Sequence, residues 1–232
     1  MSTLLLRLAG PLQSWGDSSR FNHRRTREEP TKSGVLGLLA AADGRRRTDP
    51  IEDLLALRFG VRTDQQGTLI RDFQTEIDWR SGRSMPLTHR HYLADAAFLA
   101  ALEGDSSLIE ALKDTLTHPA FPLYLGRRAC PPDGKLVIGV RETSFLDALV
   151  SEPWLASPWY RRKQSRIGVR LPICRDALPG DPVHDTVHDV PVSFDPRNRD
   201  YGWRDVVHEY TPPIDNPVGK APQHDPIALL EE

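Results

Sequence analysis

The residues best suited to bind an anion lie in one short segment, Tyr124-Leu125-Gly126-Arg127-Arg128-Ala129-Cys130-Pro131-Pro132. Gly126 has no Cβ, so its backbone can approach a phosphate closely and adopt a positive φ without steric cost. Arg127 and Arg128 carry planar guanidiniums that pair with phosphate oxygens or stack on bases. The segment therefore predicts an anion-binding loop, and the alternative is a tight turn with two solvated arginines.

A second candidate anion site is the start of a predicted helix at Thr31-Lys32-Ser33-Gly34. Thr31 or Ser33 would cap this helix, so free N–H groups and the positive end of the helix dipole would face the same place. The segment is not a Walker motif, because GxxxxGK[ST] is absent, and nucleotide hydrolysis has no support. An ordinary capped helix is the alternative.

Further candidate contacts to a nucleic acid precede that helix. Trp15, between Ser14 and Gly16, is able to stack a base, although a core anchor is the better interpretation of a lone tryptophan. An irregular basic segment follows it and contains Arg20, His23, Arg24, Arg25 and Arg27. Together these residues suggest a surface that attracts phosphates.

His89 and His91, with Arg90 between them, offer a general acid and base for RNA cleavage by attack of a 2′-hydroxyl. Residues two apart on an extended segment share one face, but no third catalytic partner can be placed from the sequence. Structural or RNA-contacting histidines are therefore the favoured interpretation, and metal-independent cleavage is the alternative.

Metal and disulfide chemistry finds little support in the sequence. The two cysteines, Cys130 and Cys174, form no CxxC pair and are predicted to be reduced and structural. His184-Asp185 and His188-Asp189 give an HxxxH spacing, but neighbouring prolines disfavour a helix and no third ligand is evident. We expect a solvated acidic loop there, and no metal or cofactor.

The composition predicts a globular protein of one domain with an appendage, or of two small domains, because 232 residues are 39% hydrophobic. No apolar run is long enough to span a bilayer and no signal sequence is evident, so we expect a cytoplasmic location. Residues 1–170 hold 25 Lys and Arg against 20 Asp and Glu, whereas residues 171–232 hold 5 against 12. The basic first part is the expected binding side.

Local patterns predict the elements that would position these residues. In chain order they are a strand at 3–8 ended by Gly10-Pro11, a helix at 34–42, a short helix at 50–57, a hairpin of 57–62 and 68–73, an exposed excursion at 74–91, a strand at 91–102, a helix at 106–116 and a strand at 135–140. This is the split βαβ order of an α+β, ferredoxin-like domain, which is also the plan of the RNA recognition module.

The remainder of the chain, residues 146–232, is predicted to form a small β-rich domain after a first domain of residues 1–145. Its expected strands are 167–173, 186–194 and 203–210, and an acidic tail follows from Pro212. Prolines are frequent here, which favours short strands and loops.

Four ordered blocks resemble the Cas-five family of RAMP proteins, and within it the CasD group of type I-E CRISPR Cascade complexes. The blocks are LLLRLAGPLQSWG, PTKSGVLGLLAAA, HYLADAAF and YLGRRACP, at the spacing of the family over most of the first domain. Beyond about Phe145 the resemblance thins to scattered residues such as Trp203 and Val206. The four blocks in order make the resemblance specific.

The resemblance implies a ferredoxin-like RAMP domain with an inserted thumb hairpin, at about 74–91 here, and a small C-terminal β domain. It implies a non-catalytic subunit that grips the 5′ handle of the CRISPR RNA, caps the filament of CasC subunits and contacts the large CasA subunit. Target DNA would be met indirectly, through the complex. Arg127, Arg128, the Thr31 helix start and the basic segment would hold the RNA, while Trp15 or Tyr124 stacks a base.

Overall fold

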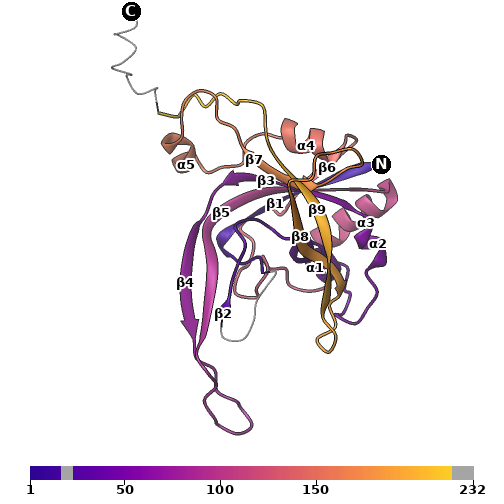
Figure 1. The fold of residues 1–232 in the computed structure, drawn as a ribbon, viewed down its shortest axis with the longest axis vertical. Coiled ribbons are helices and arrows are strands. Elements are labelled where there is room, and N and C mark those ends of the chain that lie inside the picture. Colours follow the sequence, from indigo (N-terminus) through magenta and orange to yellow (C-terminus); the bar gives the residue numbers. More distant parts are fainter. Residues whose placement is uncertain (17–22, 221–232) are drawn as a thin grey trace, which may run out of the picture.

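The computed structural model describes residues 1–16 and 23–220, which form a mixed α/β structure around one large sheet (Figure 1). Its elements are β1 Ser2–Gln13, β2 His23–Arg24, α1 Lys32–Ala42, α2 Glu52–Leu55, β3 Arg58–Gln65, β4 Thr68–Gln74, β5 Thr88–Gly104, α3 Ser106–Thr117, β6 Val137–Arg141, α4 Phe145–Ser151, α5 Pro158–Lys163, β7 Pro172–Asp176, β8 Asp185–Ser193 and β9 Asp200–Tyr210. The strands are ordered β6-β1-β5-β3-β7-β9-β8, and β2 and β4 also pair with β5. None of the described helices is long and apolar enough to cross a membrane.

The two faces of the sheet bury separate apolar clusters, because successive side chains of a strand point to opposite faces. On β1, Leu4, Leu6 and Leu8 join the larger cluster, which α1 and α3 cover. Leu5 joins a smaller cluster with Phe145 and Leu149 of α4. The largely apolar sequence of β1, which only Arg7 interrupts between Leu4 and Ala9, is thus explained by burial on both sides.

The positions of α1 and α3 agree with the helices predicted from the sequence at 34–42 and 106–116. Thr31 is the N-cap of α1, and its hydroxyl accepts a hydrogen bond from the Gly34 N–H at 3.2 Å. Asp105 caps α3 in the same way through Ser107 and Leu108. The strand preferred over a helix for 91–102 is confirmed, since β5 covers it entirely.

Two expected chain breaks are wrong. Gly10-Pro11 does not end the first strand, which continues to Gln13. β6 pairs with β1 only as far as Leu6, so Pro11 lies where that side of β1 has become an edge and proline is tolerated. The expected hairpin of 57–62 and 68–73 does not form either, because β3 and β4 follow one another along the same edge of β5.

The hairpin that does form joins β4 to the first half of β5 and projects from the body of the sheet (Figure 1). The hairpin begins near a row of three residues that lie side by side across the sheet: Pro11, Asp95 and Gly67. Pro11 lies opposite Asp95 in the pairing of β1 with β5, and Gly67 lies opposite the same residue between β3 and β4. Asp95 has a φ of 56°, whereas Pro11 has no N–H to donate. Backbone pairing is therefore weakest where the hairpin begins.

The C-terminal strands extend the same sheet, because β7 pairs with β3 from Gly60↔Arg175 to Arg62↔Ile173. β8 and β9 match the expected positions, but the strand expected at 167–173 lies instead at Pro172–Asp176. The division of the chain into two domains at residue 145 stays a prediction. Of the acidic tail expected from Pro212, residues 221–232 lie outside the described part.

Candidate nucleic-acid interface

The glycine of the glycine-arginine loop is required by the protein's own backbone. Gly126 has a φ of +85°, and a Cβ added to it would lie 1.7 Å from the carbonyl oxygen of Ser14. The Ser14 N–H also donates to the carbonyl oxygen of Leu125 at 3.1 Å. The loop therefore packs against the residue that follows β1. The close contact that was predicted between the Gly126 backbone and a phosphate is made with the Ser14 backbone instead.

The two arginines of this loop have different surroundings. Arg127 is half-buried and donates from Nη1 to the carbonyl oxygen of His91 at 3.2 Å and from Nη2 to that of Arg24 at 2.8 Å. Its guanidinium carbon also lies 4.8 Å from the centre of the Tyr92 ring. Arg128 is exposed, and its side chain is free to meet a ligand. Arg127 thus positions backbone, whereas Arg128 faces solvent.

The carbonyl oxygen of His91 is the point where the loop, β1 and β5 meet. It accepts from Arg127 and also from the Ser14 hydroxyl, at 3.1 Å. Ser14 is 3% exposed, so its predicted contact with RNA is replaced by a structural role. The Nδ1 of His91 is buried and has no hydrogen-bond partner within the described part of the chain.

β2 brings the basic segment beside the histidines of β5. The two strands pair in parallel, with His23 opposite His89 and Arg24 opposite Arg90, and the His23 and His89 rings stack with centroids 5.3 Å apart. Arg90 donates to Glu76 at 2.5 Å. We call the following set the basic surface: Arg24, Arg25, His89, Arg90 and Arg128. The predicted contact Arg20 lies outside the described residues.

Trp15 cannot stack a base in this structure. Its side chain is 0% exposed, and its indole N–H donates to Gln13 Oε1 at 3.0 Å. A Cβ added to Gly34 would lie 2.7 Å from the Trp15 ring, so the start of α1 packs directly on it. The core-anchor interpretation of Trp15 is the correct one.

The start of α1 already holds carboxylates of the chain itself. The Lys32 N–H donates to Asp189 Oδ2 at 2.8 Å, and the Lys32 ammonium donates to Asp176 Oδ2 at 2.8 Å. Thr31, Lys32 and Ser33 are each less than 10% exposed. The protein itself therefore supplies the anions predicted for Thr31–Gly34, as the carboxylates of Asp176 on β7 and Asp189 on β8.

Asp189 is the residue for which the sequence interpretation failed most clearly. It is 1% exposed on β8, and Arg204 of β9 donates to both of its oxygens, at 2.6 and 3.0 Å. The expected solvated acidic loop is wrong here, because β8 buries Val187, Asp189 and Pro191 in alternation. That period of two was the available signal.

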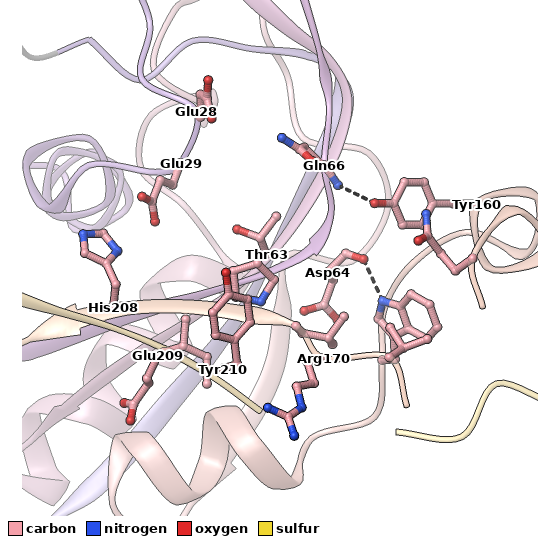
Figure 2. A pocket seen from close by; sticks show the side chains of 16 residues that line it. Glu28, Glu29, Thr63, Asp64, Gln66, Tyr160, Arg170, His208, Glu209 and Tyr210 are labelled. Atoms are coloured by element: carbon pink, nitrogen blue, oxygen red, sulfur yellow. Dashed lines mark hydrogen bonds between the residues drawn. The ribbon is translucent and has the colours of Figure 1, made fainter. Parts of the chain in front are cut away.

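A cleft of about 260 Å³ lies apart from the basic surface. Figure 2 shows Glu29, Thr63, Asp64 and His208 around it. The Trp154 indole N–H donates to the carbonyl oxygen of Asp64 at 2.6 Å. Carboxylates predominate among its charged residues, so it does not suit a phosphate.

Comparison with known proteins decides the family. The model of the family described as CRISPR-associated protein (Cas_Cas5) matches residues 3–207, which run from β1 into β9. The chain belongs to the Cas5 family. The match shows that Cas5 likeness extends well past the four blocks near the N-terminus.

Named relatives and solved structures resemble this Cas5 protein along most of its length. The Escherichia coli (strain K12) protein "CRISPR system Cascade subunit CasD" is 37% identical over 164 residues, which cover 62% of this chain and 73% of that protein. A chain of a "CRISPR RNA-guided surveillance complex" aligns with a TM-score of 0.75 at 31% identity, covering 96% of this chain and 95% of that one. A "Crystal structure of Cas protein" aligns with a TM-score of 0.71 at 39% identity, covering 93% and 99%.

Proposed function

We propose that this Cas5 protein is the CasD-type subunit of a Cascade surveillance complex, in which it holds the 5′ handle of the guide RNA. Membership of the family and identity to a Cascade subunit support the assignment. In this role the subunit would cap the CasC filament, contact CasA and cut nothing itself. It belongs to antiviral defence as part of a ribonucleoprotein in the cytoplasm.

The first part of the chain is a ferredoxin-like RAMP domain, and the β4–β5 hairpin is its thumb. Support comes from the strand order β6-β1-β5-β3, in which the first and third strands of the domain are central neighbours. The thumb is offset from the excursion expected at 74–91, because its strands are Thr68–Gln74 and the beginning of β5. Its exposed apolar residues include Phe73, Ile77 and Trp79.

The observation that carries the RNA assignment is the junction made by Arg127. Its guanidinium ties the glycine-arginine loop to β2 and β5, and so brings the loop that carries the exposed Arg128 beside the segment that carries the exposed Arg24 and Arg25. Phosphate contacts from these arginines would set the position of the strand. His89 and Arg90 of the basic surface, together with the half-buried Tyr124, are the candidates for base contacts.

A binding titration tests the assignment. The triple variant Arg24→Ala, Arg25→Ala, Arg128→Ala should bind handle RNA about tenfold to a hundredfold more weakly at physiological salt, and should show a shallower salt dependence, by about 0.7 per lost single-strand phosphate contact. A control variant removes three other exposed arginines: Arg46, Arg47 and Arg197. Equal losses in the two variants would mean that net charge, and not the basic surface, governs binding.

The alternative of metal-independent cleavage is tested separately. Purified protein incubated with repeat RNA in chelator should leave the RNA intact, because His89 stacks on His23 and no carboxylate or lysine is hydrogen-bonded to it in the described residues. A discrete cut that disappears in the His89→Ala variant would overturn the non-catalytic role. Loss of cutting in His91→Ala alone would assign the chemistry to the unpartnered Nδ1.

A further inference from the structure

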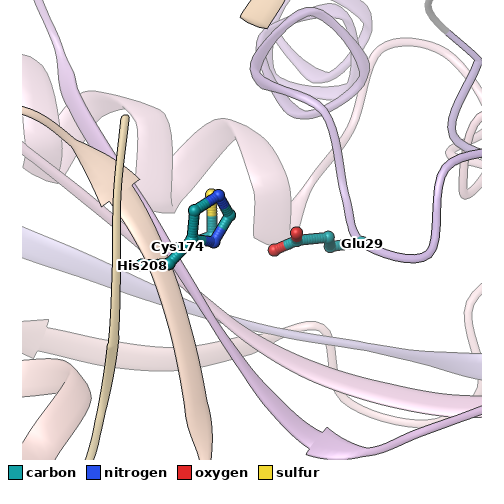
Figure 3. Close-up of side chains that lie close together, drawn as sticks. All are labelled: Glu29, Cys174 and His208. Carbon is teal, nitrogen blue, oxygen red and sulfur yellow. The ribbon is translucent and has the colours of Figure 1, made fainter. Parts of the chain in front are cut away.

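Three metal-binding side chains from separate segments meet at one wall of the cleft. They are Glu29, between β2 and α1, Cys174 of β7 and His208 of β9, and their ligand atoms all lie within 4.8 Å of one another. Cys174 and His208 are direct cross-strand partners. Figure 3 shows the Glu29 carboxylate pointing from its loop toward the sulfur and the imidazole.

This donor set has the chemistry of a zinc site. A thiolate, an imidazole nitrogen and a carboxylate oxygen are the three ligand types that Zn²⁺ takes from proteins. Three protein ligands leave the fourth tetrahedral position to water or to a further ligand. Glu29 and His208 also line the cleft of Figure 2. Hard cations such as Mg²⁺ would be disfavoured by the sulfur.

The charges around the cluster also suit a cation. The nearby cation Arg204 is already paired with Asp189 and Asp176. Burial first and the neighbouring Glu29 carboxylate second raise the pKa of the Cys174 thiol to about 12, so an ion bound here would have to displace the thiol proton.

We propose that Glu29, Cys174 and His208 bind a divalent transition-metal ion, with Zn²⁺ the best fit. The ion would replace the thiol proton and draw the three side chains together, which the half-buried Glu29 and the exposed His208 can accommodate. It would fasten the segment between β2 and α1 to β7 and β9. The proposal stands independently of RNA binding.

Cobalt provides a direct test, because Co²⁺ bound to a thiolate has a sulfur-to-metal charge-transfer absorption in the near ultraviolet. Tag-free protein titrated with Co²⁺ should develop this band at one equivalent, and Zn²⁺ should displace it. Cys174→Ser should abolish the band, whereas His208→Gln and Glu29→Gln should weaken binding at least about tenfold. Cys130→Ala is the thiol control and should retain the full signal, because Cys130 is buried away from the cluster.

A stability measurement gives the second readout. Zn²⁺ should raise the thermal midpoint of the wild type and of Cys130→Ala, since an ion that binds only the folded state stabilises it, but should not raise that of Cys174→Ser. Circular dichroism without metal checks that the variants fold. A cobalt band that persists in Cys174→Ser, or absence of metal binding by the folded wild type, would overturn the proposal.

Discussion

Arg127 donates from Nη2 to the carbonyl oxygen of Arg24 at 2.8 Å, although the two residues lie 103 positions apart in the chain. One arginine thereby fixes the backbone from which another arginine projects. The adjacent Arg128 has no such role and is exposed. Substitution of Arg127 is therefore expected to reduce stability, whereas substitution of the neighbouring Arg128 is expected to leave stability nearly unchanged.

Arg127→Ala should lower the free energy of unfolding by about 1–3 kcal/mol, because two backbone carbonyl oxygens lose a charged donor. Arg128→Ala should change it by less than about 0.5 kcal/mol, as is usual for an exposed side chain. Urea unfolding of the two variants measures the difference. Equal costs would show that Arg127 does not hold the junction.

Gly126→Ala should be strongly destabilising, by about 3 kcal/mol or more, since the new Cβ would overlap the Ser14 carbonyl oxygen and the φ is +85°. Gly180 is a matched control: its φ is +93° but nothing lies within 4 Å of an added Cβ. Gly180→Ala should cost only the left-handed backbone term of about 1–2 kcal/mol. Thermal unfolding of both variants separates crowding from backbone strain.

Asp189→Asn should destabilise the protein by about 1–3 kcal/mol, because it removes one of the two carboxylate charges paired with the largely buried Arg204. Asp185→Asn, on the same strand but exposed, should be nearly neutral. Chemical denaturation measures both. If the two substitutions cost the same, Asp189 is not the anchor that joins β8 to the start of α1.

Acid should selectively remove the contribution of the Arg45–Asp53 pair. The bidentate hydrogen bonds from Arg45, at 2.5 and 2.6 Å, hold the pKa of the Asp53 carboxyl below its usual range. As the pH falls below about 4, the unfolded chain takes up this proton first, so stability is lost. The wild type should exceed Asp53→Asn in stability above that pH, and the gap should close as the pH falls through the folded pKa. Because Asp53 is partly exposed, the gap should be small and should shrink in high salt.

Local patterns predicted α1, α2 and α3 and the approximate places of the longer strands, because capping and hydrophobic periodicity are encoded within a few residues, but α4 and α5 were not predicted. Thr31 and Asp105 are caps that can be recognised from their neighbours alone. The failures are non-local. The chain does not turn back at Gly67. It continues along β5 instead, because β5 extends beyond Ala97 and offers further pairing positions to β4.

The candidate site shows the same limit. The glycine-arginine loop was located correctly, but the different roles of Arg127 and Arg128 depend on carbonyl oxygens contributed by His91 and Arg24. Asp189 looked solvated because its partners, Lys32 and Arg204, come from a distant helix and a neighbouring strand. The spacing of residues within one segment does not reveal which distant segment will pair with it.

The row of Pro11, Asp95 and Gly67 makes β5 one strand with two mechanical parts. Residues from Ala97 toward Gly104 lie between β1 and β3, and Ala94 and Leu93 still pair with β1. The part of β5 nearer Thr88 pairs with β4 and, at His89 and Arg90, with the short strand β2. Amides of the hairpin should therefore exchange with solvent deuterium at a lower opening free energy than those of the body. The hairpin can then separate, bend and re-form against a partner while the core from which it grows stays closed.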